Sequence, residues 1–351
     1  MMLVLQNIAC IHPNKDVLFN QIYLAVNRHD KAALIGNNGV GKTTLLQIIA
    51  DLRQPSEGTV CREAAPYYVP QIFGQYNHLT IAEALKIADK LHALKEILDG
   101  NVTEANLALL NDDWDIEERC RKALDDWKLD ALDLQQKMET LSGGEKTKVF
   151  LAGISVHRPE FILLDEPTNH LDTAGRQRLY DFIQSCSATL LVVSHDRKLL
   201  NLLHTVCELS RHGIRVYGGN YDFYAVQKLT ESRALQQDVQ SREKALRKAK
   251  EKERETWERR QRQDARGAKQ QKKEGMSRIM MDKMKNDAEK STSRLQGVHA
   301  EKIAALSQSV SELRKELPDR DKMKFDFDNS ALHKGKILVK ASGVNYCYGS
   351  R

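Results

Sequence analysis

The sequence predicts an α/β fold with a mostly parallel sheet, a helical insertion, and a long antiparallel helical hairpin after it. In residues 1–224, short β-rich runs alternate with helical stretches, as in parallel α/β proteins. Between about Thr80 and Thr140 the pattern becomes helical and acidic. From about Ala225 to Pro318 the residues Gln, Lys, Arg, Glu and Ala dominate, and this stretch has no internal proline.

Three apolar runs are candidates for buried strands of the sheet: Lys31–Gly36, Phe161–Asp165 and Thr189–Ser194. Short continuous apolar runs are typical of strands that are buried on both faces. A shorter strand is expected at Pro66-Tyr-Tyr-Val-Pro. The helical subdomain is expected over about 80–155, where it interrupts the α/β unit.

The segment 225–325 is predicted to form the hairpin, and 326–351 to begin a second α/β unit, because Ile337-Leu-Val echoes Met2-Leu-Val. On the second, returning helix of the hairpin, an apolar heptad stripe is expected to pack against the first helix; it consists of Ile303, Leu306, Val310, Leu313 and Leu317. A weaker apolar row on the outgoing side consists of Leu235, Val239, Leu246 and Ala249. Acid-first pairs four residues apart should support the outgoing helix: Glu243/Arg247, Glu255/Arg259 and Glu258/Arg262. The helix is expected to break at Gly267 and Gly275.

Composition argues against a membrane-spanning or disulfide-framed protein. The longest apolar runs of this 351-residue chain are about five residues long, whereas a spanning helix needs about 20. The six cysteines include no CxxC pair, and the first residues lack the pattern of a signal peptide, so we expect a cytoplasmic protein.

The net charge of +6 is unevenly distributed along the chain. Residues Lys228–Lys324 hold 27 Lys+Arg and 17 Asp+Glu, a balance of +10, and the remaining 27 basic and 31 acidic residues give −4. The hairpin segment is therefore a candidate for binding a polyanion.

A phosphate-binding loop is predicted between the first apolar strand and the helix after it. Residues Gly36–Thr43 match the pattern GxxxxGK[ST]. The backbone N–H groups of such a loop surround phosphate oxygens, while Lys42 should reach the β- and γ-phosphates and Thr43 should ligate Mg²⁺. The residues expected to hold the nucleotide here are Gly36, Asn37, Asn38, Gly39, Val40, Gly41, Lys42, Thr43 and Thr44.

Two carboxylates end the second apolar strand, at Asp165 and Glu166. In a chain with a phosphate-binding loop, Asp165 is expected to hold the Mg²⁺ shell and Glu166 to polarise the attacking water. Neighbouring residues of an extended chain point to opposite sides, so the two acids must differ in role.

Leu141-Ser-Gly-Gly-Glu145 lies between the loop and this strand, and it resembles the signature sequence of ATP-binding cassette proteins. The resemblance implies that Gln71 senses the γ-phosphate and metal, and that His195 is the switch histidine. It assigns catalytic roles to Gln71, Glu166 and His195, and Mg²⁺ to Thr43, Gln71 and Asp165. It assigns further ATP contacts to Ser142, Gly143, Gly144 and Asp172.

Asp165-Glu-Pro-Thr-Asn-His-Leu-Asp172 narrows the resemblance to the ABC-F branch, whose members join two cassettes by a long charged linker and have no transmembrane domain. This implies an ATPase that acts on the ribosome, in translation regulation or antibiotic protection. ATP in this superfamily lies between the loop of one cassette and the signature of another, so a second cassette or a homodimer partner is implied. One departure is that the first loop offers only His12 to stack on adenine, whereas Tyr346 and Tyr348 lie in the expected second copy.

Ten basic residues and three acids occupy the predicted tip of the hairpin, between Arg259 and Lys285. RNA contacts with rRNA or tRNA are expected at Arg259, Arg260, Arg262, Arg266, Lys269, Lys272, Lys273, Arg278, Lys283 and Lys285. Two alternatives remain open: the ATPase subunit of an ABC transporter, and a non-catalytic or DNA-directed scaffold with the hairpin as a coiled-coil spacer.

Overall fold

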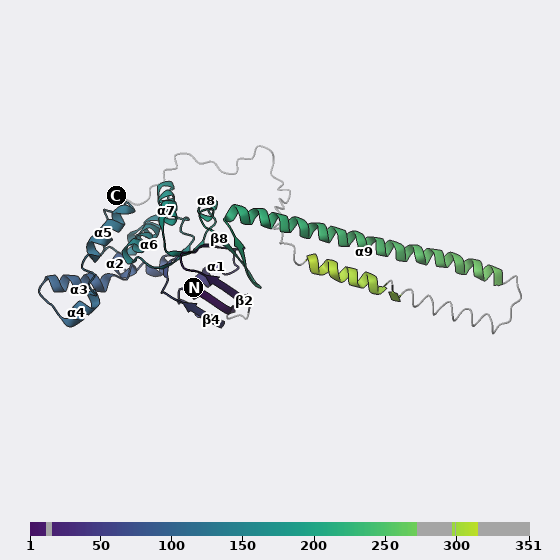
Figure 1. Cartoon of the computed structure of the whole chain (residues 1–351), viewed down its shortest axis with the longest axis horizontal. Helices are drawn as coiled ribbons and strands as arrows, with labels where there is room; N and C mark the ends of the chain where they lie inside the picture. The colour runs from purple at the N-terminus through teal and green to yellow at the C-terminus, as the bar shows by residue number, and fades with distance from the viewer. Residues whose placement is uncertain (12–15, 272–296, 299, 315–351) are drawn as a thin grey trace, which may run out of the picture. The chain divides into compact units, whose positions relative to one another are not determined.

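The computed structural model describes four ranges of the chain, residues 1–11, 16–271, 297–298 and 300–314 (Figure 1). The chain divides into two compact units, Met1–Thr230 and Glu231–Arg351. The expected start of a second α/β unit, with Tyr346 and Tyr348, and the first-loop residue His12 lie outside the described residues.

The first unit contains a six-stranded sheet in the order β5-β6-β7-β3-β8-β9. All neighbouring pairs are parallel except β8 and β9, which are antiparallel. The strands are β3 (Lys31–Ile35), β5 (Tyr67–Val69), β6 (Phe161–Asp165), β7 (Thr189–Val193), β8 (Thr205–Ser210) and β9 (Gly213–Gly218). The three strands predicted from the apolar runs and the α/β class are therefore confirmed.

Both faces of this sheet are buried, which explains the unbroken apolar runs. Ile162 and Leu164 of β6 belong to one core cluster, while Phe161 and Leu163 belong to another. The first cluster lies against helices that include α7 (Thr173–Ser185) and α8 (Arg197–Leu200). Alternation across a strand places successive side chains in different layers, so a strand between two layers is apolar at every position.

The second core cluster contains α1 (Lys42–Ile49) and a three-stranded antiparallel sheet in the order β2-β1-β4 (Figure 1). These strands are β1 (Leu3–Ile11), β2 (Val17–Val26) and β4 (Glu57–Arg62). The α1 residues Leu45, Leu46, Ile48 and Ile49 are all buried. The helix that follows the phosphate-binding loop is thus held in place by apolar packing in this cluster.

The helical insertion occupies the predicted region. Its helices are α2 (Ile81–Ala84), α3 (Ala88–Leu98), α4 (Glu104–Leu110), α5 (Ile116–Asp126) and α6 (Gly143–His157). Helix α6 begins three residues before the expected Lys146, because Ser142 caps it: the Ser142 hydroxyl accepts from Glu145 N–H, and the Glu145 carboxylate accepts from Ser142 N–H.

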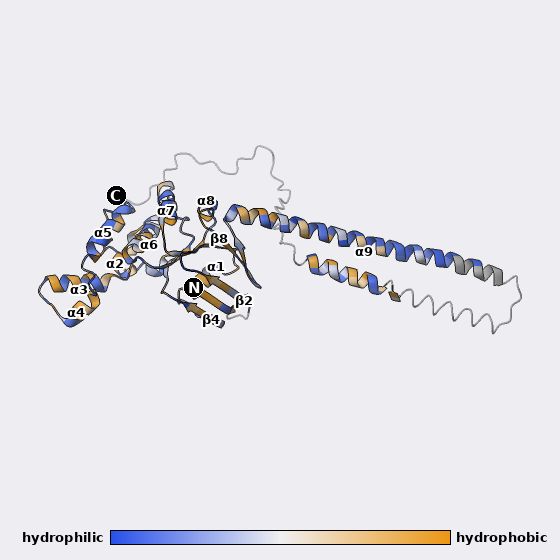
Figure 2. Ribbon diagram, in the orientation of Figure 1, coloured by the Kyte–Doolittle hydropathy of each residue, from blue (hydrophilic) through white to orange (hydrophobic). Residues whose placement is uncertain are grey.

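Helix α9 (Tyr221–Gln271) is continuous over 51 residues and mostly hydrophilic (Figure 2). The expected break at Gly267 is wrong, since the helix continues through that residue to Gln271. A single glycine weakens a helix by only about 1 kcal/mol, and good helix formers lie on both sides of it. Gly275 lies outside the described residues.

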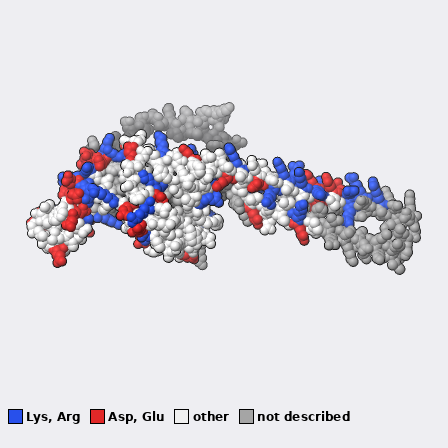
Figure 3. Space-filling view, viewed as in Figure 1, with Lys and Arg blue, Asp and Glu red and all other residues white. Residues whose placement is uncertain are grey.

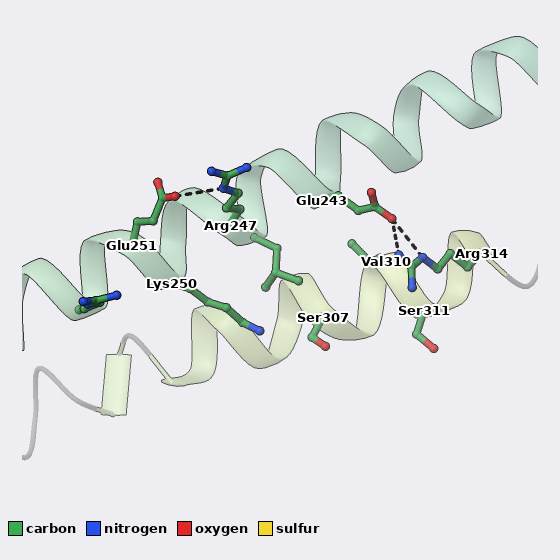
Figure 4. A pocket seen from close by; sticks show the side chains of 10 residues that line it. Glu243, Arg247, Lys250, Glu251, Ser307, Val310, Ser311 and Arg314 are labelled. Carbon is green, nitrogen blue, oxygen red and sulfur yellow. Dashed lines mark hydrogen bonds and ion pairs between the residues drawn. The ribbon is translucent and has the colours of Figure 1, made fainter.

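The second unit contains the hairpin stem, in which the helical segment 300–314 runs antiparallel to α9 (Figure 4). Val239 and Val310 are buried, and Ile303, Leu306 and Leu313 are half-buried, as the predicted stripe requires, whereas Leu317 lies outside the described residues. The expected Glu243/Arg247 pair is wrong: Arg314 donates to Glu243 at 2.6 Å, and Arg247 pairs with Glu251. Likewise Glu258 pairs with Arg254, four residues before it.

Candidate functional site

A cavity of about 570 Å³ lies at the carboxyl ends of the parallel strands, the usual ligand site of such sheets. Ten of the predicted site residues line it: Asn38, Gly39, Gly41, Lys42, Thr43, Thr44, Gln71, Asp165, Glu166 and His195. The cavity therefore brings together the loop, both strand-end carboxylates, Gln71 and His195.

The loop between β3 and α1 needs glycine at two positions for steric reasons. A Cβ at Gly36 would lie 2.5 Å from the carbonyl oxygen of Leu209, and φ there is 154°. At Gly41, where φ is 100°, a Cβ would lie within 3 Å of the side chains of Leu18 and Phe19. The loop therefore lies directly against β8 and β2, and a side chain at either position would displace it.

Lys42 lies within the arc of this loop. Its Nζ donates to the carbonyl oxygens of Gly36, at 2.8 Å, and Asn37, at 3.2 Å. Burial lowers the pKa of Lys42, and the carboxylates of Glu166 and Asp165 counteract that effect. The ammonium is thus held at the mouth of the loop, at the position from which it can reach phosphate oxygens.

Asp165 is completely buried at the end of β6. Its Oδ2 accepts from the hydroxyl of Tyr68 at 3.2 Å, and its Oδ1 has no hydrogen-bond partner. Burial raises the pKa of Asp165, and the polar neighbours Thr43 and Tyr68 and the charge of Lys42 oppose that rise.

This arrangement fits Mg²⁺. A buried carboxylate oxygen without a partner needs a cation or a donor, and Thr43 and Gln71 line the same cavity. Over the described ranges, no three His, Cys, Asp or Glu side chains converge to form a metal site on their own. Mg²⁺ suits such a setting, since it uses one or two carboxylates together with substrate phosphates.

Glu166 follows Asp165 in a left-handed backbone conformation, with φ of 49°. This turn directs its carboxylate toward His195: Oε2 accepts from the His195 N–H at 3.2 Å, and Oε1 lies 3.4 Å from His195 Nε2. Burial raises the pKa of Glu166, while the neighbouring His195 lowers it. A desolvated carboxylate beside an imidazole at the cavity wall is suited to accept a proton from water.

The signature residues do not line this cavity. Ser142 serves as the N-cap of α6, and Gly143 and Gly144 lie against His170. Asp172 caps α7 by accepting from Gly175 N–H at 2.8 Å. Of the predicted loop residues, Gly36, Asn37 and Val40 also lie outside the cavity lining, and Val40 packs into the core below the loop.

Sequence reasoning missed several residues of the site. Leu18, Asn169 and Val193 line the cavity, and Tyr68 holds Asp165. The signal for Tyr68 was present in the predicted strand Pro66–Pro70, which carries two adjacent tyrosines that must face opposite sides.

The basic residues of the predicted tip are described only in part. Arg259, Arg260, Arg262 and Arg266 lie on α9, where all but the half-buried Arg260 are exposed, and positive and negative side chains are interspersed along the helix (Figure 3). Lys269 lies within the α9 backbone. The other predicted contacts lie outside the described residues: Lys272, Lys273, Arg278, Lys283 and Lys285.

The fold and the site define a nucleotide-binding cassette of the ABC ATPase class, and comparisons with known proteins agree. Residues 19–169 match the family model described as ABC transporter. A dimeric ATP-binding cassette in a post-hydrolysis state with ADP and Pi has a similar fold, with a TM-score of 0.50 at 20% identity, over 62% of this chain and 98% of that one.

Curated relatives specify the branch. Tylosin resistance ATP-binding protein TlrC of Streptomyces fradiae is 32% identical over 63% of this chain and 45% of its own length. ABC transporter F family member 2 of Arabidopsis thaliana is 33% identical over 65% of this chain and 31% of its own length. Energy-dependent translational throttle protein EttA of Haemophilus influenzae is 30% identical over 67% of this chain and 46% of its own length.

The chain therefore contains an ATP-binding cassette, and it is similar to proteins of the ABC-F type. It spans between about a third and a half of the length of these relatives. None of the helices that the structure describes has the length and apolar character needed to cross a lipid bilayer.

Proposed function

We propose that this chain binds ATP with Mg²⁺ in the cavity at the end of β6 and hydrolyses it to ADP and phosphate. The gathering of Lys42, Asp165, Glu166 and His195 around one cavity carries the proposal. Lys42 and the loop N–H groups bind the phosphates, and Asp165 with Thr43 and Gln71 holds the ion, which neutralises charge on the phosphates. Glu166 accepts the proton of the attacking water, and His195 orients that carboxylate.

The test is the rate of ATP hydrolysis by Glu166→Gln, which keeps the size of the side chain and removes the base. We expect the rate to fall by about 10²–10⁴-fold, with ATP still bound, because loss of a general base has effects of this size. Glu160→Gln is the matched control, since Glu160 is exposed and precedes the opposite end of β6. An unchanged rate in Glu166→Gln would remove Glu166 from this role.

The same proposal requires a second cassette. Ser142 and the glycines after it lie outside the nucleotide cavity, so they are available to cover the ATP of another copy. We propose that the opposing signature comes from a second cassette, in a longer protein or in a second copy of this chain. ATP-dependent dimerisation of the Glu166→Gln chain, measured by sedimentation velocity, tests this proposal, and a strictly monomeric chain at saturating ATP would count against the second-copy form.

We further propose that the protein acts on ribosomes in the cytoplasm and that cassette closure positions the basic hairpin near tRNA or rRNA. Two observations support this. One relative is named a translational throttle protein and another a tylosin resistance protein. The exposed Arg259, Arg262 and Arg266 project from α9 at spacings of three and four residues, so they lie along one side of the helix.

Sedimentation of the Glu166→Gln chain with purified ribosomes tests the ribosomal role, in ATP and in ADP, over a series of salt concentrations. We expect binding that depends on ATP and weakens with salt. Replacing Arg259, Arg262 and Arg266 by Gln should reduce the slope of log affinity against log salt by about two, at about 0.7–0.9 per lost phosphate contact. Binding that is equal in ATP and ADP would contradict the closure mechanism.

The alternative function is the ATPase subunit of a membrane transporter, and the description of the matching family model favours it. Co-purification of the chain with a membrane permease, together with an absence of ribosome binding, would support this alternative.

A further inference from the structure

The Asp165 carboxylate is held asymmetrically. Its Oδ2 accepts a hydrogen bond from Tyr68 at 3.2 Å, whereas its Oδ1 has no partner. An ionised carboxylate has two equivalent oxygens, and without a donor either could face the cavity. A donor on one oxygen leaves the other as the free ligand.

Tyr68 reaches Asp165 from the neighbouring strand. In the β5–β6 pair, Tyr68 lies beside Leu163, and Asp165 is two residues further along β6, on the same face of the sheet as Leu163. The phenol therefore extends along β6 toward its carboxyl end, where the cavity lies. The amide side chain of Gln47 on α1 is a second polar neighbour of the Tyr68 side chain.

The Tyr68 side chain thus lies between the helix after the phosphate-binding loop and the strand-end carboxylate. A phenol keeps its proton at neutral pH, so the Tyr68 hydroxyl acts as a donor to the Asp165 carboxylate.

We propose that Tyr68 is a positioning residue that orients Asp165 so that Oδ1 faces the nucleotide-bound Mg²⁺. This inference rests on the proposed Mg–ATP site and deepens it. Tyr68 is not among the residues that line the nucleotide cavity; it acts through Asp165, in the way that hydrogen-bond partners behind metal ligands fix ligand orientation.

The preceding residue provides a matched control. Tyr67 is adjacent in β5, so its side chain faces the opposite side, where its hydroxyl donates to the carbonyl oxygen of Phe150 at 2.9 Å. Tyr67→Phe and Tyr68→Phe each delete one half-buried hydroxyl from the same strand. Only the second deletion removes a hydrogen bond to Asp165.

The experiment measures binding of a fluorescent ATP analogue to the full chain, first in EDTA and then in a Mg²⁺ titration. For Tyr68→Phe we expect an apparent Mg²⁺ dissociation constant about tenfold higher, the lower end of the loss seen when a partner of a metal ligand is removed. Nucleotide affinity in EDTA should equal that of the wild type, which also shows that the variant is folded. Tyr67→Phe should leave both constants unchanged.

A second variant, Gln47→Met, keeps the Tyr68 hydroxyl but removes the polar neighbour on its other side, and should raise the Mg²⁺ constant by about two- to threefold. This variant decides the question if Tyr68→Phe does not fold. Unchanged Mg²⁺ constants in the folded variants, or equal losses in Tyr67→Phe and Tyr68→Phe, would overturn the positioning role. A wild-type chain whose nucleotide binding ignores Mg²⁺ would instead overturn the proposed metal site.

Discussion

Gly144 of the signature sequence is predicted to be a steric requirement of the fold. It is the second residue of α6, and a Cβ there would lie 2.7 Å from the backbone carbonyl oxygen of His170. Close C–H···O contacts lie at about 3.3 Å, so Gly144→Ala must displace the loop or the helix by about 0.6 Å. His170 follows the strand that carries the two carboxylates, which leaves little freedom for this displacement.

The expected effect follows from two opposing contributions. Alanine favours a helix over glycine by about 1 kcal/mol, and overpacking of this kind costs about 1–3 kcal/mol. Gly143→Ala is the matched control, since its Cβ would lie 3.4 Å from the His170 ring, an ordinary contact. Because both variants gain helix propensity, we expect Gly144→Ala to be less stable than Gly143→Ala by about 1–3 kcal/mol.

Urea unfolding measures this difference, followed by the fluorescence of Trp127, which is buried in the same core cluster as much of α6. The midpoints of the two variants are compared at equal slopes. Two alanine variants with the same free energy of unfolding, within about 0.5 kcal/mol, would refute the reasoning, because the close approach to His170 would then carry no free energy.

Three further predictions concern charged side chains. Arg119→Met should destabilise the chain by about 1–3 kcal/mol, because the mostly buried guanidinium of Arg119 binds two aspartates and the carbonyl oxygen of Val156. Arg121 is exposed, so Arg121→Met should change the stability by less than about 0.5 kcal/mol. Glu208→Gln should speed amide hydrogen exchange in residues 221–228 by about tenfold, because two tyrosines and Lys228 donate to this carboxylate and two of these donors lie on α9. Burial raises the pKa of Asp165 and Glu166, so these groups keep their protons to higher pH in the folded chain than in the unfolded chain. The free energy of unfolding without nucleotide should therefore fall as the pH rises from about 4 toward the raised pKa values.

Each of these has a direct check. Equal losses for the Arg119 and Arg121 variants in urea unfolding would contradict the role of burial. Unchanged exchange at the start of α9 in Glu208→Gln would show that this carboxylate does not anchor the helix. For the pH dependence, Asp165→Asn should flatten the stability profile between pH 4 and the raised pKa, and an unaltered profile would contradict the effect of the buried acid.

The sequence alone predicted the chemistry of the site, because its components are local. The glycines and Lys42 of the phosphate-binding loop lie within eight residues, and Asp165 and Glu166 directly follow a five-residue apolar run. The spacing of neighbouring residues is enough to predict the loop and the strand end, since each forms within a short continuous segment. The layers of the sheet were predictable for the same reason: an unbroken apolar strand has to be covered on both faces.

Only the tertiary structure decided which distant groups meet. Tyr68 and Asp165 lie 97 residues apart, and nothing in either local sequence states that their strands are neighbours. In the hairpin, Glu243 pairs with Arg314 on the other helix and not with Arg247 on its own helix, because Glu243 lies on the side of α9 that faces the other helix. Sequence determines what a residue can do through its chemistry and its immediate neighbours. The packing of segments distant in sequence determines its partners, and here that packing selects which oxygen of Asp165 remains free.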